Sequence, residues 1–187
     1  MSDSSSKILD PKDPSRKVAV VTGAGRGIGR ALTEELLKRN YFVVAVVRSQ
    51  DHLVEFASFS SDELAGVICD VTNPDSESVL SSFLPSIVGH IDLLINNAGF
   101  GASAYGVEGL KFEELDRVIA VSLHGPIRCV RACLPLLRKS STGVILNISS
   151  RFASLEWVAS ETVPSDQATY AYRIGKAALN MFTSCLS

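Results

Sequence analysis

Tyr172 and Lys176 stand one helical turn apart in a segment that is predicted to be helical from Thr169 onward. Residues i and i+4 share one face of a helix, so the phenol and the ammonium should lie close together. A free tyrosine has a pKa of about 10 and exchanges protons poorly near neutrality. A nearby ammonium favours the phenolate and lowers that pKa. Tyr172 is therefore a candidate acid–base group; Tyr170 is not, because Ile174 lies four residues beyond it.

A second chemical feature is the glycine-rich turn that follows the first apolar run and precedes a helical pattern. A helix N-terminus offers unpaired N–H groups and a partial positive charge, which suits phosphate. Glycines allow a tight turn and a close backbone approach to a dinucleotide. The candidate cofactor-binding residues of this turn are Gly23, Gly25, Arg26, Gly27, Ile28 and Gly29.

Short apolar segments alternate with helical patterns along most of the chain. Such alternation predicts an α/β fold with a doubly wound, Rossmann-type parallel sheet and helices on both faces. The expected strands are 17–22, 41–47, 65–69, 91–95 and 143–148, and the expected helices are 28–40, 75–88, 112–139 and 169 onward, with a loop at 151–168. Residues 1–16 are polar and are expected to form a disordered arm, which leaves one domain over residues 17–187.

Composition argues against several classes of protein. The net charge is −2, so no broad basic surface suggests a nucleic-acid partner. The four cysteines are too sparse for a disulfide framework and have no metal-ligand spacing, so we expect reduced thiols and no metal site. No apolar stretch is long enough to span a membrane, and the polar N-terminus is unlike a signal peptide. A cytoplasmic protein is the default expectation.

Four motifs in their order resemble those of the short-chain dehydrogenases/reductases. They are Thr22–Gly29; Asp70-Val71 after the third strand; Asn96-Asn97-Ala98-Gly99 after the fourth; and Tyr172-Arg-Ile-Gly-Lys176. The resemblance runs from about Lys17 to the C-terminus and is closest to the small carbonyl-reductase-like branch. It implies a hydride transfer between a nicotinamide and a carbonyl or secondary alcohol. It also implies that Asp70, Val71, Asn97, Ala98 and Gly99 line the cofactor.

The end of the second strand bears on the choice of cofactor. NAD enzymes place Asp or Glu there to hold the ribose hydroxyls. This chain has Val47 followed by Arg48, and Arg26 lies in the glycine turn. Arginines can pair with a 2′-phosphate through charge-assisted hydrogen bonds. NADP(H) is therefore predicted over NAD(H).

The resemblance also assigns roles around the tyrosine. Tyr172 would be the general acid in reduction and the general base in oxidation. Lys176 would tune it and hold the nicotinamide ribose. Ser150, in Asn147-Ile148-Ser149-Ser150, would orient the substrate oxygen, with Ser149 as the alternative.

Two features depart from the family pattern. Ser122 stands where the family has an asparagine that anchors a water for proton relay; its hydroxyl could still hold a water, and the nearby His124 is a weaker substitute. The segment between Ser150 and Tyr172 is longer than usual and carries Trp157, which either shapes a substrate pocket or packs into the body.

The last predicted helix reaches Ser187 without a stop pattern, whereas related chains continue with two more strands and a substrate-covering loop. We expect a partial chain, with a natural short form as the alternative. An exposed edge at the fifth strand would follow. A non-catalytic NADP(H)-binding sensor or scaffold is the competing function. In the family the two long helices pair between subunits, which implies a homodimer or homotetramer.

Overall fold

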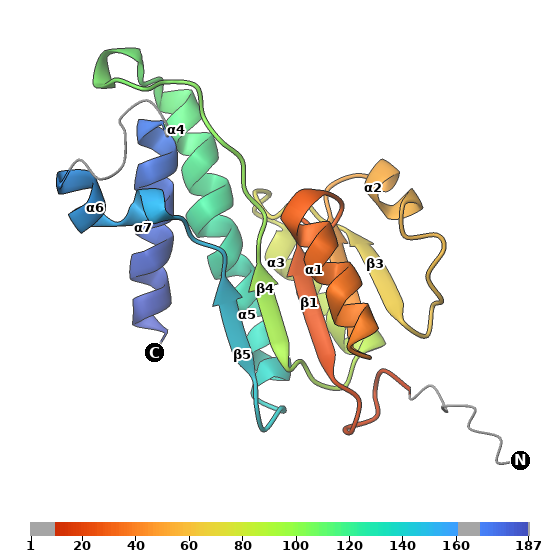
Figure 1. Cartoon of the computed structure of the whole chain (residues 1–187). Helices are drawn as coiled ribbons and strands as arrows, with labels where there is room; N and C mark the ends of the chain where they lie inside the picture. Colours follow the sequence, from red (N-terminus) through yellow and green to blue (C-terminus); the bar gives the residue numbers. More distant parts are fainter. Residues whose placement is uncertain (1–9, 161–168, 187) are drawn as a thin grey trace, which may run out of the picture.

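Five short apolar strands form one parallel sheet at the centre of the molecule (Figure 1). The computed structural model describes residues 10–160 and 169–186. The sheet order is β3-β2-β1-β4-β5, so the predicted doubly wound α/β fold is confirmed. The strands are β1 (Val18–Thr22), β2 (Phe42–Val47), β3 (Leu64–Ile68), β4 (Leu93–Asn96) and β5 (Val144–Asn147).

Helices cover both faces of the sheet (Figure 1). One face packs against α3 (Ser76–Ile87) and α5 (Gly125–Leu137), and the other against α1 (Gly27–Lys38). Alternate residues of β1 serve the two layers: Val18 and Val20 belong to the first core, and Ala19 and Val21 to the second. Burial on both faces explains why each central strand is a continuous apolar run.

The order in which strands are added to the sheet reverses at β1. The chain runs from β1 outward to β2 and β3, then crosses to β4 on the other side of β1 and continues to β5. In such sheets the loops on either side of the reversal diverge and leave a crevice at the carboxyl ends of the strands. The glycine turn after β1 and the Asn97 segment after β4 border this crevice.

The expected helix over 112–139 is present but is not uniform. It consists of α4 (Phe112–Ile119), a π-helical turn η2 (Ala120–His124) and α5. Pro126 stands at the start of α5, where a missing N–H costs little, and Pro135 lies inside it. Helix α7 (Tyr170–Cys185) packs along α4 and η2 (Figure 1). A π-helical turn widens the helix locally and redirects its side chains.

Four short elements were not predicted. Helix α2 (Gln50–Val54) follows β2, and η1 (Val107–Gly109) precedes α4. The expected loop at 151–168 contains η3 (Arg151–Ala153) and α6 (Leu155–Ala159), while residues 161–168 lie outside the described residues. One or two turns are too short for a periodic pattern to be read. Serine side chains cap the starts of η3 and α6. The Ser150 hydroxyl accepts from the Phe152 amide, and the Ser154 hydroxyl accepts from the Trp157 amide.

The part of the arm that the structure describes packs against the domain. Residues 10–16 form turns in which the Asp10 and Asp13 carboxylates accept backbone hydrogen bonds. Arg16 is buried, with its guanidinium 5.3 Å from the centre of the Phe42 ring. This differs from the disordered arm expected for residues 1–16, because a cation on an aromatic face holds the segment in place. Residues 1–9 lie outside the described residues.

Among the described residues, β5 forms one edge of the sheet. Val144 and Leu146 on this strand are 52% and 43% exposed. No helix within residues 10–160 or 169–186 is both long and apolar enough to cross a membrane.

Candidate active site

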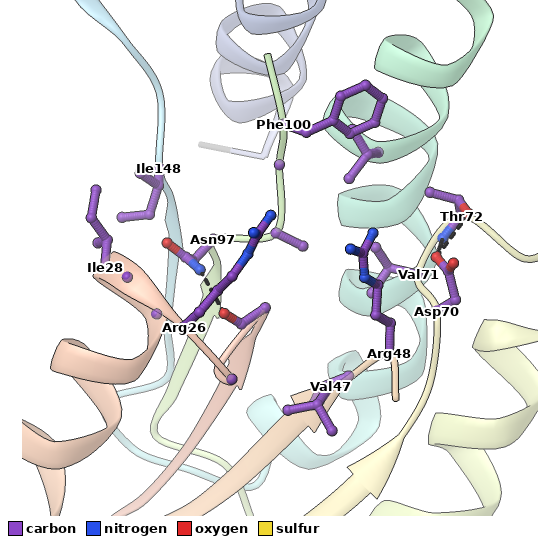
Figure 2. A pocket seen from close by; sticks show the side chains of 18 of the residues that line it. Arg26, Ile28, Val47, Arg48, Asp70, Val71, Thr72, Asn97, Phe100 and Ile148 are labelled. Atoms are coloured by element: carbon purple, nitrogen blue, oxygen red, sulfur yellow. Dashed lines mark hydrogen bonds between the residues drawn. The ribbon is translucent and has the colours of Figure 1, made fainter. Parts of the chain in front are cut away.

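A cavity of about 1050 Å³ occupies the crevice at the carboxyl edge of the sheet (Figure 2). Nearly all of the residues predicted from the sequence to bind a cofactor or to act as acid and base line it. They are Gly23, Gly25, Arg26, Gly27, Ile28, Gly29, Arg48, Asp70, Val71, Asn97, Ala98, Gly99, Tyr172 and Lys176. Ser150 and Ser122 are not among its lining residues.

The glycine turn is tied to the end of β4 by Asn97. The Asn97 side-chain amide donates to the carbonyls of Thr22 and Gly23, at 2.9 and 3.3 Å. The Thr22 hydroxyl in turn accepts from the Asn97 and Ala98 amides. Gly23 has φ +64°, and a Cβ at Gly23 would lie 2.9 Å from the Ala98 Cα. Glycine is therefore required there both for conformation and for close approach.

The start of α1 fits an anionic ligand. Its N-cap residue, Arg26, makes no side-chain capping bond, and the first turn contains no acidic residue. Neither the N-cap side chain nor a side chain of the first turn therefore accepts from the first amides of the helix. The helix dipole adds partial positive charge at this end. A pyrophosphate is the ligand that such a turn suits.

Arg26 and Arg48 rise from the glycine turn and from the end of β2 toward the same part of the cavity (Figure 2). Both are exposed, and within the described residues neither forms a salt bridge. The Asp70 carboxylate accepts from the Thr72 amide and hydroxyl at 2.9 and 2.7 Å and forms no salt bridge with Arg48. Two guanidinium groups are thus available to an anion.

Tyr172 and Lys176 lie together on the opposite side of the cavity. The Lys176 Nζ is 5.9 Å from the centre of the Tyr172 ring and donates a 2.6 Å hydrogen bond to the Ile148 carbonyl. Lys176 is only 4% exposed, and burial lowers its pKa because a charged ammonium is costly in an apolar surrounding. The Phe152 ring packs edge-on against Tyr172, with 6.5 Å between centres. The phenol is thus held between an aromatic ring and a buried cation.

The two serines after β5 have different partners. The Ser149 hydroxyl donates to the Asn180 side chain on α7, at 2.5 Å. The Ser150 hydroxyl accepts from the Phe152 amide at 3.2 Å, and within residues 10–160 and 169–186 its own proton has no acceptor. Although Ser149 contributes to the cavity wall, its hydroxyl is committed to Asn180. Of the two serines, Ser150 is the one whose proton has no acceptor among the described residues.

Ser122 lies in the π-helical turn and faces α7. It is 1% exposed, and its hydroxyl has no hydrogen-bond partner in the part of the chain that the structure describes. Its Oγ is 3.2 Å from the position that a Cβ on Gly175 would take. Ser122 is therefore beside the helical turn that separates Tyr172 from Lys176. His124 is exposed and does not line the cavity, so the placement does not support it as a substitute for the family's asparagine.

Trp157 follows neither of the two expectations. It lies on α6, is 44% exposed and is not a lining residue of the cavity. Among the lining residues that were not predicted from the sequence are His52, Phe100 and Arg117. The Arg117 guanidinium lies 5.3 Å from the centre of the Phe100 ring at the cavity wall. No local motif marks these three side chains, because their positions depend on how loops and α4 close over the crevice.

The family model for short chain dehydrogenase matches residues 17–187. The chain belongs to the short-chain dehydrogenase family. An oxidoreductase from Staphylococcus epidermidis is 35% identical over 137 residues, and a fatty acyl-CoA reductase from Acinetobacter baylyi is 33% identical over 175 residues. These matches cover 72% and 91% of this chain but 58% and 56% of the relatives. The chain thus spans a little more than half the length of these curated relatives.

Solved structures of the family share the fold. An NADPH-bound carbonyl reductase from chicken fatty liver is 31% identical with a TM-score of 0.79, over 91% of this chain and 72% of that one. An alcohol dehydrogenase from the archaeon Thermococcus sibiricus, in complex with 5-hydroxy-NADP, is 28% identical with a TM-score of 0.79, over 91% of this chain and 70% of that one. Both of these solved structures hold a nicotinamide dinucleotide phosphate or an analogue of it.

Proposed function

We propose that this protein is an NADP(H)-dependent oxidoreductase that interconverts a carbonyl group and a secondary alcohol. The observation that carries the proposal concerns a single cavity. It is lined on one side by the glycine turn at the start of α1 and on the other side by the Tyr172–Lys176 pair. A ligand that extends along the carboxyl edge of the sheet would have its phosphates at the turn and its reactive end beside the phenol. NADPH in the related carbonyl reductase supports the choice of cofactor.

When bound, the nicotinamide would exchange a hydride with the substrate carbon. In the reducing direction, the Tyr172 hydroxyl gives its proton to the carbonyl oxygen; in the oxidising direction, the Tyr172 phenolate takes the proton of the alcohol. Lys176 favours the phenolate by its charge. The Ile148 carbonyl accepts from Lys176 and so offsets part of the cost of burying the ammonium.

Ser150 would orient the substrate. Its oxygen accepts from the Phe152 amide, and its proton, which has no acceptor among the described residues, would donate to the carbonyl oxygen of a substrate. A small aldehyde, ketone or quinone has that acceptor and no charge. The proposal assigns Ser150 to positioning this oxygen beside Tyr172, and Ser122 to the buried surroundings of the tyrosine and lysine.

The proposed preference for NADP(H) rests on Arg26 and Arg48. Arg48→Asp removes a cation and adds a carboxylate that repels a 2′-phosphate, so the Kd for NADPH should rise by about tenfold or more while that for NADH changes little. Arg138→Asp is the matched control, since Arg138 is exposed at the end of α5, away from the cavity. Equal effects of Arg48→Asp on both nucleotides would contradict the assignment.

The activity itself is tested by following NADPH oxidation with a panel of aldehydes, ketones and quinones. Turnover of one or more carbonyl compounds supports the proposed reductase. Saturable NADPH binding without turnover across the panel supports instead a non-catalytic NADP(H)-binding sensor or scaffold, the function that Ser122 in place of the family's asparagine would favour. Size-exclusion chromatography with light scattering tests the homodimer or homotetramer implied by the family.

A further inference from the structure

Arg117 on α4 is a cation of the cavity wall that neither the cofactor nor the acid–base assignments use. Within residues 10–160 and 169–186, the arginines and lysines that line the cavity are Arg26, Arg48, Arg117 and Lys176. Arg26 and Arg48 are assigned to the cofactor phosphate, and Lys176 is assigned to Tyr172. The charge of Arg117 is therefore left for another ligand.

Packing against α7 fixes the place of Arg117 relative to the acid–base pair. Val118, the next residue of α4, is fully buried, and a Cβ on Gly175 would lie 2.7 Å from its Cγ1. Gly175 lies on the turn of α7 that follows Tyr172. Val121, one helical turn after Arg117, also lines the cavity, so this face of the long helix is turned toward it. Arg117 is thus presented to the cavity by a helix that packs on the helix of Tyr172.

The Phe100 ring holds the guanidinium by its face. The Arg117 Cζ lies 5.3 Å from the ring centre, and Phe100 is half-buried at the cavity wall. Phe100 directly follows Gly99, where a Cβ would lie 3.7 Å from the Lys176 Nζ. Stacking uses the face of a guanidinium and leaves the N–H groups at its edge for hydrogen bonds. An apolar ring beside such donors suits a ligand with an apolar body and an anionic end.

Glu114, one turn before Arg117 on α4, attracts the guanidinium but hydrogen-bonds elsewhere. Its Oε1 accepts from the Ser103 amide at 2.7 Å, which fastens the loop after β4 to α4. No salt bridge in the described part of the chain includes Arg117, and Arg117 is exposed. An incoming carboxylate can therefore reach the guanidinium without breaking an ion pair, and can form charge-assisted hydrogen bonds with it.

We propose that Arg117 binds a carboxylate of the substrate and directs the enzyme toward carbonyl compounds that carry an acidic group away from the reacting carbon. The inference rests on the proposed function and narrows its substrate class. The reacting carbonyl lies beside Tyr172, and the carboxylate pairs with the edge of the guanidinium next to Phe100. Oxo acids with an apolar or aromatic body have both groups. Because Arg117 binds a remote part of the substrate, it sets KM rather than kcat.

The test compares para-carboxybenzaldehyde with its methyl ester, which has the same aldehyde and no charge. We expect Arg117→Gln to raise KM for the acid about tenfold, while kcat and the KM for the ester stay within about twofold. Arg117→Lys keeps the charge without the planar fork and should fall between Arg117→Gln and the unaltered protein. Lys111→Gln removes an exposed cation at the start of the same helix, outside the cavity wall, and should change none of these constants.

The Kd for NADPH separates a substrate contact from a cofactor contact. Arg117→Gln should leave this Kd unchanged; if NADPH binds more weakly instead, Arg117 contacts the cofactor and the inference is wrong. Equal changes in KM for the acid and the ester, or no change in either, also overturn it, while turnover of the ester leaves the proposed function intact.

If neither aldehyde is reduced, calorimetric titration of the NADP⁺ complex with para-carboxybenzyl alcohol decides the inference. Weaker binding in Arg117→Gln supports the carboxylate site, whereas equal or absent binding overturns it. Failure of the proposed function shows separately, as a lack of turnover across the whole panel of carbonyl compounds.

Discussion

The Lys176 ammonium lies 2.6 Å from the carbonyl oxygen of Ile148, the residue that follows β5. This bond joins the helix that carries Tyr172 to the end of the sheet. A mid-helix lysine is usually exposed, whereas this one is 4% exposed. The ammonium is thus held beside the phenol and the cavity.

Tyr172→Phe removes the acid–base hydroxyl and keeps the ring that packs on Phe152. We expect kcat/KM to fall by about 10²-fold to 10⁴-fold, with the Kd for NADPH nearly unchanged. The matched control is Tyr170→Phe, because Tyr170 is 42% exposed and does not line the cavity. Steady-state kinetics with one active carbonyl substrate provide the comparison. If Tyr172→Phe retained most of the activity, Tyr172 would not be the general acid.

The buried Lys176 should make stability depend on pH. Burial lowers its pKa from the ordinary 10.5, so between the lowered pKa and 10.5 the unfolded chain binds more protons than the folded one. The free energy of unfolding then rises with pH in this window, because the folded state loses a costly buried charge first. Urea unfolding of the unaltered protein and of Lys176→Met should show this rise only in the former. Lys139→Met, at an exposed lysine, serves as the control. Parallel pH curves for the unaltered protein and Lys176→Met would contradict the burial of a charged lysine.

The close contact at Gly29 should make the glycine turn intolerant of any side chain. A Cβ at this position would collide with the Gly23 carbonyl and the Asn97 side-chain amide, which hydrogen-bond to each other. Gly29→Ala should lower the free energy of unfolding by about 2 to 3 kcal/mol. Gly101→Ala is the control, because a Cβ there would meet nothing within 4 Å. Denaturant titration measures both, and a neutral Gly29→Ala would mean that the turn can open.

Three of the four cysteines should be unreactive in the folded protein. Burial raises the pKa of Cys129 to about 12 and also raises those of Cys133 and Cys69, whereas Cys185 is exposed. A thiol reagent at neutral pH should therefore label one cysteine quickly and the rest only after unfolding, since the thiolate is the reactive form. Cys185→Ser should abolish the fast reaction. Fast labelling of a second cysteine would contradict the protection of these three thiols by burial.

The sequence by itself determined the motifs whose members are close along the chain. The i, i+4 spacing placed Tyr172 and Lys176 on one face of a helix, and the alternation of apolar runs with helical patterns was enough for the parallel sheet. Periodicity carries this information because backbone geometry repeats locally.

Only the tertiary structure decided which distant groups meet. Ile148 accepts from Lys176 because β5 ends where α7 passes, and His52 reaches Gly25 because α2 folds back over the turn after β1. The same holds for Ser149, whose hydroxyl is taken by Asn180 on α7. Such contacts depend on packing between elements that are far apart in sequence, and no local pattern of residues records the direction in which a loop or a short helix returns to the sheet.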